Sequence, residues 1–137
     1  MGSGVIHAED FNKETILLVD DDIGVLRSLR LTLSRSGYEV LPADSAEKAI
    51  EIWEQHSQQI GLLLTDIRMP GKSGLELAAI LRQKRPQLPV LLISGYSAEL
   101  TDNEERILPS MHFLQKPFST KVLSETVRKA TQCCSLP

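Results

Sequence analysis

The chain has 137 residues, enough for one domain with a buried core, and its 42% hydrophobic and 24% charged residues are typical of a soluble globular protein. A net charge of −3 and an aromatic content of 4% provide neither a basic field nor a base-stacking surface, which argues against a nucleic-acid partner. No apolar run reaches the roughly 18 residues of a membrane span, so we expect no membrane partner and a cytoplasmic location.

The two ends of the chain show no pattern that predicts structure. Residues 1–14 are polar and unpatterned, and we interpret them as a flexible lead-in or as residues left from cloning. Residues 133–137 form a short tail, in which the adjacent Cys133 and Cys134 suggest free thiols, because there is no disulfide framework and no second pair of zinc ligands. One domain is therefore expected over residues 15–132.

The first predicted strand covers residues 16–19, which are all apolar, and three aspartates follow it at residues 20–22. Apolar residues at helical spacing over 25–33 then predict a helix. Asp22 is a plausible N-cap for this helix, and Gly37 is expected to close it at the C-terminal end.

The second strand is predicted over residues 38–43. It is less apolar than the first, and we place it near a sheet edge because Pro42 cannot donate to a ladder. Asp44 or Ser45 is expected to cap the helix that follows. The predicted buried side of this helix consists of Ala46, Ala49, Ile50 and Trp53.

The third strand is the apolar run at residues 62–64, which is too short for a free-standing helix. It leads to Asp66, at the end of the strand where open α/β sheets bind their ligands. The alternative is that Asp66 only opens a turn, as aspartate often does. A third helix then ends before Pro86. Its predicted apolar stripe is Leu75, Ala78, Ala79 and Leu81.

Two more strands are predicted, over residues 88–94 and 112–116. The segment between them, residues 97–108, is weakly helical. Ser119 is expected to cap the last helix. The predicted inner side of that helix is Val122, Leu123, Val127 and Ala130.

Strands and helices thus alternate five times, and four of the strands are almost entirely apolar. That pattern is typical of an α/β fold whose parallel sheet has helices on both faces. Because crossover connections between parallel strands are right-handed, the prediction is a doubly wound five-stranded sheet.

Polar side chains follow the ends of four of these strands: Asp20 and Asp21, Asp66, Ser94, and Lys116. The carboxyl ends of parallel strands share one edge of a sheet, where three carboxylates repel one another unless a cation joins them. Mg²⁺ suits such hard oxygen ligands. A lysine and a hydroxyl complete a pocket for a phosphoryl group, and a carboxylate can itself be the nucleophile that forms an aspartyl phosphate.

Each residue also has an ordinary structural explanation. Asp22 fits a helix cap better than a metal ligand. Taken singly, Ser94 is a strand-end hydroxyl and Lys116 a solvated charge. Lys116 precedes Pro117, however, which keeps its backbone extended. The conjunction of these residues in this order is what favours a phosphoryl site.

These residues and their neighbours resemble the response-regulator receiver domain, the phosphoacceptor module of two-component signalling. The resemblance covers residues from about 15 to 132. The matching segments are 16–22, 63–71 with 73–74, 91–95 and 113–118. The family has a flavodoxin-like sheet of strand order 2-1-3-4-5, which we carry over to this chain. It also implies a cis peptide bond between Lys116 and Pro117, for which proline lowers the cost.

The resemblance implies a role for each residue of the site. Asp66 would accept a phosphoryl group from a histidine kinase or a histidine phosphotransfer protein, and Lys116 would pair with the phosphate. Asp20 and Asp21, with Asp66 and the backbone carbonyl of Arg68, would bind the Mg²⁺ cofactor.

The resemblance also implies a switch. Ser94 would move toward the phosphate and Phe113 would change rotamer, altering the face made by the fourth helix, the fifth strand and the fifth helix. Arg68 and Tyr96 occupy places that tune phosphoryl lifetime, and their size predicts slow autodephosphorylation. The chain departs from the commonest pattern at Ser94, where threonine is more frequent, at Gly95, where alanine is, and at Phe113, where tyrosine is.

We therefore expect a signalling receiver and not an enzyme with an external substrate. One alternative is an aspartyl-nucleophile phosphatase, but such enzymes carry a second aspartate two residues after the nucleophile, where this chain has Arg68. The other is a receiver-like docking domain that does not respond to phosphate, against which the intact acidic set argues. The sequence leaves open the cognate kinase, the output, dimerisation on phosphorylation, and whether the receiver stands alone or belongs to a hybrid kinase or longer regulator.

Overall fold

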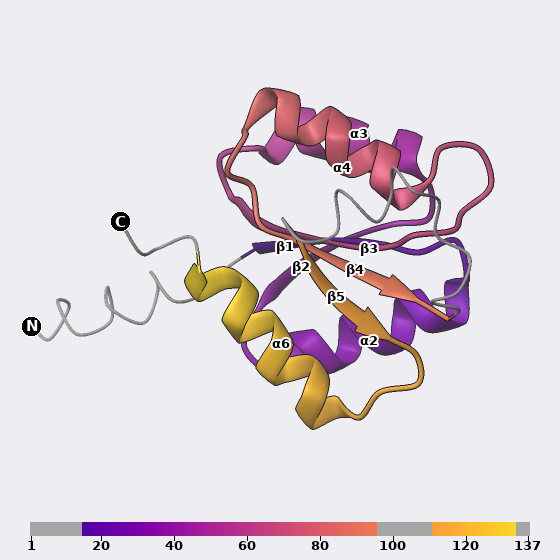
Figure 1. The fold of residues 1–137 in the computed structure, drawn as a ribbon, viewed down its shortest axis with the longest axis vertical. Helices are drawn as coiled ribbons and strands as arrows, with labels where there is room; N and C mark the ends of the chain where they lie inside the picture. The colour runs from indigo at the N-terminus through magenta and orange to yellow at the C-terminus, as the bar shows by residue number, and fades with distance from the viewer. Residues whose placement is uncertain (1–14, 96–110, 134–137) are drawn as a thin grey trace, which may run out of the picture.

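The computed structural model describes residues 15–95 and 111–133 (Figure 1). Strands and helices alternate along most of this range. The strands are β1 (Thr15–Val19), β2 (Glu39–Ala43), β3 (Ile60–Asp66), β4 (Val90–Ser94) and β5 (His112–Gln115), and the helices are α2 (Ile23–Arg35), α3 (Ala46–His56), α4 (Gly74–Lys84) and α6 (Thr120–Cys133). The predicted helical segment at residues 97–108 lies outside the described residues.

The five strands form one parallel sheet in the order β2-β1-β3-β4-β5. This confirms the predicted fold class and strand order. β2 lies at an edge, as the proline in it predicted. β3 is longer than its apolar run indicated, since it already begins at Ile60.

Helices cover both faces of the sheet, with α3 and α4 on one side and α2 and α6 on the other (Figure 1). Alternate residues of the central strands serve the two faces. In β1, Leu17 and Val19 belong to the core under α3 and α4, whereas Ile16 and Leu18 belong to the core under α2 and α6. All four are fully buried, which explains why this strand is apolar throughout.

Local sequence signals fix the helix ends. The Asp22 side chain accepts hydrogen bonds from the N–H groups of Gly24 and Val25, so it is an N-cap as predicted. At the other end of α2, Gly37 has a φ of 101°, and the N–H of Tyr38 returns to the carbonyl of Leu33. α2 is thereby ended before the chain enters β2.

The caps of the other helices follow the same rules. Ser45, and not Asp44, caps α3 by accepting from the N–H of Lys48. Ser119 accepts from the N–H of Val122 at the start of α6. α4 begins with a capping box, in which Ser73 and Glu76 satisfy each other's backbone N–H groups.

Two residues predicted to face the core are exposed. Ala79 lies on the solvent side of α4, while Leu77, which the predicted stripe omitted, is fully buried. α4 packs against both the sheet and α3, so its buried face is wider than a single stripe. Val122 is 42% exposed because the buried stripe of α6 follows Leu123, Val127 and Ala130, one residue away around the helix.

Arg85, the C-cap residue of α4, lies at the edge of the sheet opposite the carboxyl ends of the strands. Its guanidinium lies 4.8 Å from the ring centroid of Trp53 and donates to the carbonyls of Ser57 and Ile60. The end of α4 is thus joined to the α3–β3 turn. Within the described part of the chain, no helix combines the length and apolar character needed to cross a bilayer.

Candidate functional site

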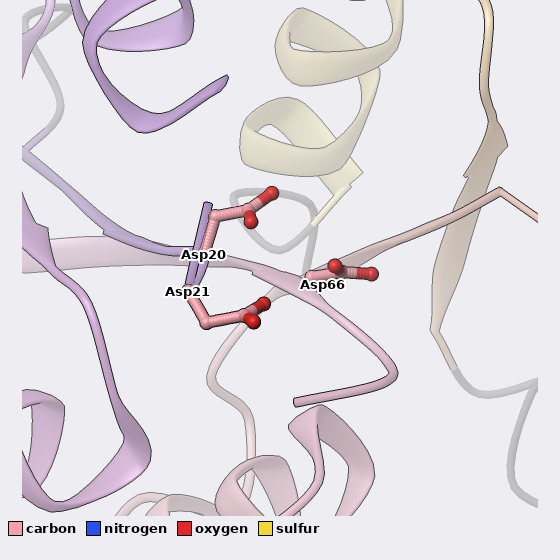
Figure 2. Close-up of side chains that lie close together, drawn as sticks. All are labelled: Asp20, Asp21 and Asp66. Carbon is pink, nitrogen blue, oxygen red and sulfur yellow. The ribbon is translucent and has the colours of Figure 1, made fainter. Parts of the chain in front are cut away.

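Three carboxylates gather at the carboxyl edge of the sheet (Figure 2). Asp20 and Asp21 directly follow β1, and Asp66 ends β3, the neighbouring strand. Each offers an oxygen within 4.8 Å of the others. Asp20 is buried, Asp66 is half-buried and Asp21 is exposed, so the cluster opens to solvent on one side. Asp22 is not part of this cluster, since its carboxylate caps α2.

Lys116 brings a positive charge to the same edge. It follows β5, and its Nζ lies 3.5 Å from Asp20 Oδ2 and 4.0 Å from Asp66 Oδ2. These are ion pairs at long range and not short hydrogen bonds. The backbone N–H of Lys116 donates to the Ser94 carbonyl at 2.8 Å, and the Lys116–Pro117 peptide bond is cis, as the resemblance implied. The hydrogen bond to Ser94 thus continues the pairing of β5 with β4 as far as Lys116.

The environment of Asp66 disfavours its ionised form. Burial raises the pKa of its carboxyl above the ordinary value of 3.8, Lys116 opposes the rise, and the charge of Asp20 adds to it. The backbone N–H of Arg68 donates to the carboxylate and lowers the pKa, while Asp21 raises it by a smaller amount. The net rise in the pKa is therefore due mainly to the burial of the Asp66 carboxyl.

Ser94 and Phe113 lie on adjacent strands near the cluster. Ser94 is the last residue of β4 and is 2% exposed, so its hydroxyl is inside the edge of the sheet. Phe113 pairs with Leu92 across the β4–β5 ladder and packs, half-buried, against the core under α3 and α4. Ser94 is therefore buried at the carboxyl edge of the sheet, whereas Phe113 lies within β5 on the face under α3 and α4.

Two further predicted residues, Arg68 and Gly95, border this edge. Arg68 is exposed, two residues after Asp66. Gly95 is exposed, and a Cβ at this position would meet nothing within 4 Å. Tyr96 lies outside the described residues, so its predicted role in phosphoryl lifetime stays a prediction.

One residue of the site entered the sequence argument only as part of the resemblance. Gly74, the first residue of α4, comes so close to the backbone of Asp66 that a Cβ there would overlap the Asp66 carbonyl. A glycine directly after a serine N-cap was the signal that could have indicated this close approach.

The donor set fits a hard divalent cation. Three carboxylate oxygens close together, one of them half-buried and carrying a raised pKa, match the oxygen ligands that Mg²⁺ takes from proteins. Lys116 brings one positive charge within 4.0 Å of two of these carboxylates, those of Asp20 and Asp66. The arrangement can therefore hold a cation together with an anionic group.

Comparison with known proteins gives a consistent result. Residues 16–128 match the model of the response regulator receiver domain. The response regulator protein FleR of Pseudomonas aeruginosa is 33% identical over 114 residues, covering 83% of this chain and 24% of FleR. The sensor kinase CckA of Brucella abortus is 35% identical over 118 residues, covering 84% of this chain and 12% of CckA. The chain thus spans about a quarter or less of these relatives.

A solved structure supports the same comparison. The response regulator protein TrrA of Thermotoga maritima, solved in complex with Mg²⁺-BeF, has a TM-score of 0.74 and 31% identity. The alignment covers 85% of this chain and 98% of TrrA. The similarity therefore extends over most of this chain and nearly all of TrrA.

Proposed function

This chain belongs to the response regulator receiver domain family, and on that premise we propose that it accepts a phosphoryl group on Asp66 from a phosphohistidine. The donor would be a histidine kinase or a histidine phosphotransfer protein, and the receiver domain would occupy residues 15–132. The observation that supports this most is the gathering of Asp20, Asp21, Asp66 and Lys116 at one sheet edge. The chain would act as a signalling module whose only chemistry is its own phosphorylation and dephosphorylation.

In the proposed step, a carboxylate oxygen of Asp66 forms a bond to phosphorus as the P–N bond to the donor imidazole breaks. The product is an acyl phosphate on Asp66 and a free histidine on the donor. Lys116 Nζ, already 4.0 Å from Asp66 Oδ2, would pair with a phosphoryl oxygen. The N–H of Arg68 orients the carboxylate by donating to it.

Asp20, Asp21, Asp66 and the backbone carbonyl of Arg68 would hold Mg²⁺. When bound, Mg²⁺ supplies positive charge that offsets the carboxylates and the incoming phosphoryl oxygens. The role of the protein residues is to keep these oxygens close enough to share one ion. Asp20 is suited to this because its Oδ1 already accepts from the N–H of Asp22 at 2.9 Å, which fixes the carboxylate.

Phosphoryl charge on Asp66 would then bias a two-state equilibrium. Ser94 would donate to the phosphoryl group and Phe113 would turn inward, altering the surface of β5 and α6. Moving such an equilibrium from 1:99 to 99:1 requires about 5.5 kcal/mol of differential interaction. Because residue 113 has no hydroxyl, packing would provide the contribution of its side chain to this difference.

The proposal is tested with the small donor phosphoramidate, whose P–N bond stands in for that of phosphohistidine. With Mg²⁺, we expect the intact mass to rise by one phosphoryl group, and with EDTA we expect no rise. Asp66→Asn should not be labelled, whereas the matched control Asp22→Asn, outside the cluster, should be labelled as wild type. The proposal would be overturned if Asp66→Asn were labelled, or if the folded wild type were not labelled in the presence of Mg²⁺.

A further inference from the structure

Thr65, the residue before Asp66 in β3, is a fully buried hydroxyl. Its partners across the sheet are Val19 on β1 and Leu92 on β4, which both belong to the core under α3 and α4. An apolar side chain would fill this place without the cost of burying a hydroxyl. Packing alone therefore does not account for a threonine here.

The Thr65 hydroxyl donates to the backbone carbonyl of Asp66, with an O–O distance of 3.0 Å. The pairing of β1 with β3 ends at Val19 and Thr65, so the Asp66 carbonyl lies one residue beyond that ladder. The hydroxyl consequently holds the peptide group after Asp66 at the point where the strand becomes a loop.

The start of α4 restrains the same peptide group from another side. A Cβ on Gly74 would overlap the Asp66 carbonyl oxygen and would lie 3.1 Å from Cγ2 of Thr65. The N–H of Gly74 also donates to the carbonyl of Ile67 at 2.8 Å. The Asp66 carbonyl is thus enclosed by the Thr65 side chain and the first turn of α4, which leaves it little room to rotate.

We propose that Thr65 is a positioning residue for phosphoryl acceptance, acting through the Asp66 carbonyl; the inference rests on the proposed function of Asp66. The peptide it holds sets the direction of the Asp66 side chain. It also begins the loop from which the N–H of Arg68 donates to the Asp66 carboxylate. The N–H of the same peptide group, that of Ile67, donates to the Ile93 carbonyl at 2.9 Å, so losing the hydroxyl removes one of two hydrogen bonds that hold the peptide. The acceptor and the metal ligands are thereby loosened together.

The test compares Thr65→Val, which keeps the shape and removes the hydroxyl, with Thr65→Ser, which keeps the hydroxyl and removes the methyl group. Thr65→Ala, which removes both, is measured in parallel. Three quantities are followed for the full chain: the rate of labelling by phosphoramidate with Mg²⁺, the Mg²⁺ dissociation constant from calorimetry, and the melting temperature. Calorimetry needs no phosphoryl transfer, so it reports on positioning separately from activity.

We expect Thr65→Val and Thr65→Ala to be labelled about fivefold more slowly than wild type and to bind Mg²⁺ more weakly. A fivefold change corresponds to the loss of one neutral hydrogen bond. Thr65→Ser should label and bind Mg²⁺ as wild type, although loss of a buried methyl lowers its melting temperature. Wild-type labelling and Mg²⁺ affinity in Thr65→Val, or equal defects in Thr65→Ser, would overturn the inference. If wild type is not labelled, the proposed function fails, and the Mg²⁺ affinities still decide the role of Thr65.

Discussion

Replacing Asp66 by asparagine should stabilise the chain at neutral pH when no divalent cation is present. The Asp66 charge has two acidic neighbours with oxygens within 4.8 Å and one lysine at 4.0 Å. Two unit charges at these distances interact by about 1 kcal/mol in water and about 4 kcal/mol at an effective dielectric constant of 20. Lys116 and the N–H of Arg68 outweigh the two repulsions, so the gain comes from removing a buried charge, which is the largest cause of the raised pKa of Asp66. We expect the neutral amide to add stability on the order of 1 kcal/mol.

The pH dependence follows from the raised pKa of Asp66. A carboxyl whose pKa is higher in the folded than in the unfolded chain adds stability below its ordinary value of 3.8 and loses it as the pH rises through the folded value. At neutral pH the wild type has lost that contribution. The advantage of the asparagine variant should therefore shrink as the pH falls, and vanish below both pKa values.

The assay is urea unfolding in EDTA, followed by far-ultraviolet circular dichroism at several pH values. Asp22→Asn is the matched control, because asparagine also caps helices well and its stability should stay near that of wild type. Added Mg²⁺ should stabilise the wild type more than Asp66→Asn, since it binds the folded carboxylate cluster. An asparagine variant no more stable than wild type at neutral pH in EDTA would refute the reasoning.

Three further predictions concern single residues. Lys116→Met should slow phosphoramidate labelling at least tenfold because the phosphoryl charge loses its lysine partner, with Lys116→Arg retaining more activity; unchanged rates in Lys116→Met would contradict this. Arg85→Ala should lower the free energy of unfolding by about 2–3 kcal/mol, since it removes the stack on Trp53 and two hydrogen bonds to backbone carbonyls, while labelling stays normal. Urea unfolding followed by Trp53 fluorescence measures the loss, and a variant as stable as wild type would contradict this prediction. The acyl phosphate should persist for minutes or longer, because the large Arg68 side chain shields it from water, and Arg68→Ala should shorten its lifetime. Intact mass after donor removal measures the lifetime, and a wild-type half-life of seconds would contradict this expectation.

Much of the fold followed from patterns that act over a few residues. Asp22 was predictable as a cap because an aspartate before a helical repeat satisfies backbone N–H groups wherever the helix packs. Strand order was not predictable from such rules and came from the resemblance. The inner faces were predicted less well, as Ala79 and Val122 show, because the width of a buried stripe depends on which neighbours the helix meets.

The site was predictable to the level of which strand ends meet. The parallel arrangement itself places residues after β1, β3, β4 and β5 on one edge. Because β4 lies between β3 and β5, the approach of Lys116 to Asp66 also depends on the strand order and on the direction of the long lysine side chain. The hydrogen bond from the Thr65 hydroxyl to the Asp66 carbonyl could not be predicted from the sequence, because it depends on the rotamer of Thr65 and on where the pairing of β1 with β3 ends. The close approach of Gly74 likewise depends on how α4 docks.

The most direct test of the account is to locate the phosphoryl group. After incubation with phosphoramidate and Mg²⁺, the chain is digested under conditions that preserve acyl phosphates, and the modified peptide is sequenced by tandem mass spectrometry. The account predicts one modification, on Asp66. A phosphoryl group on Asp20, Asp21 or Ser94 in place of Asp66 would contradict it.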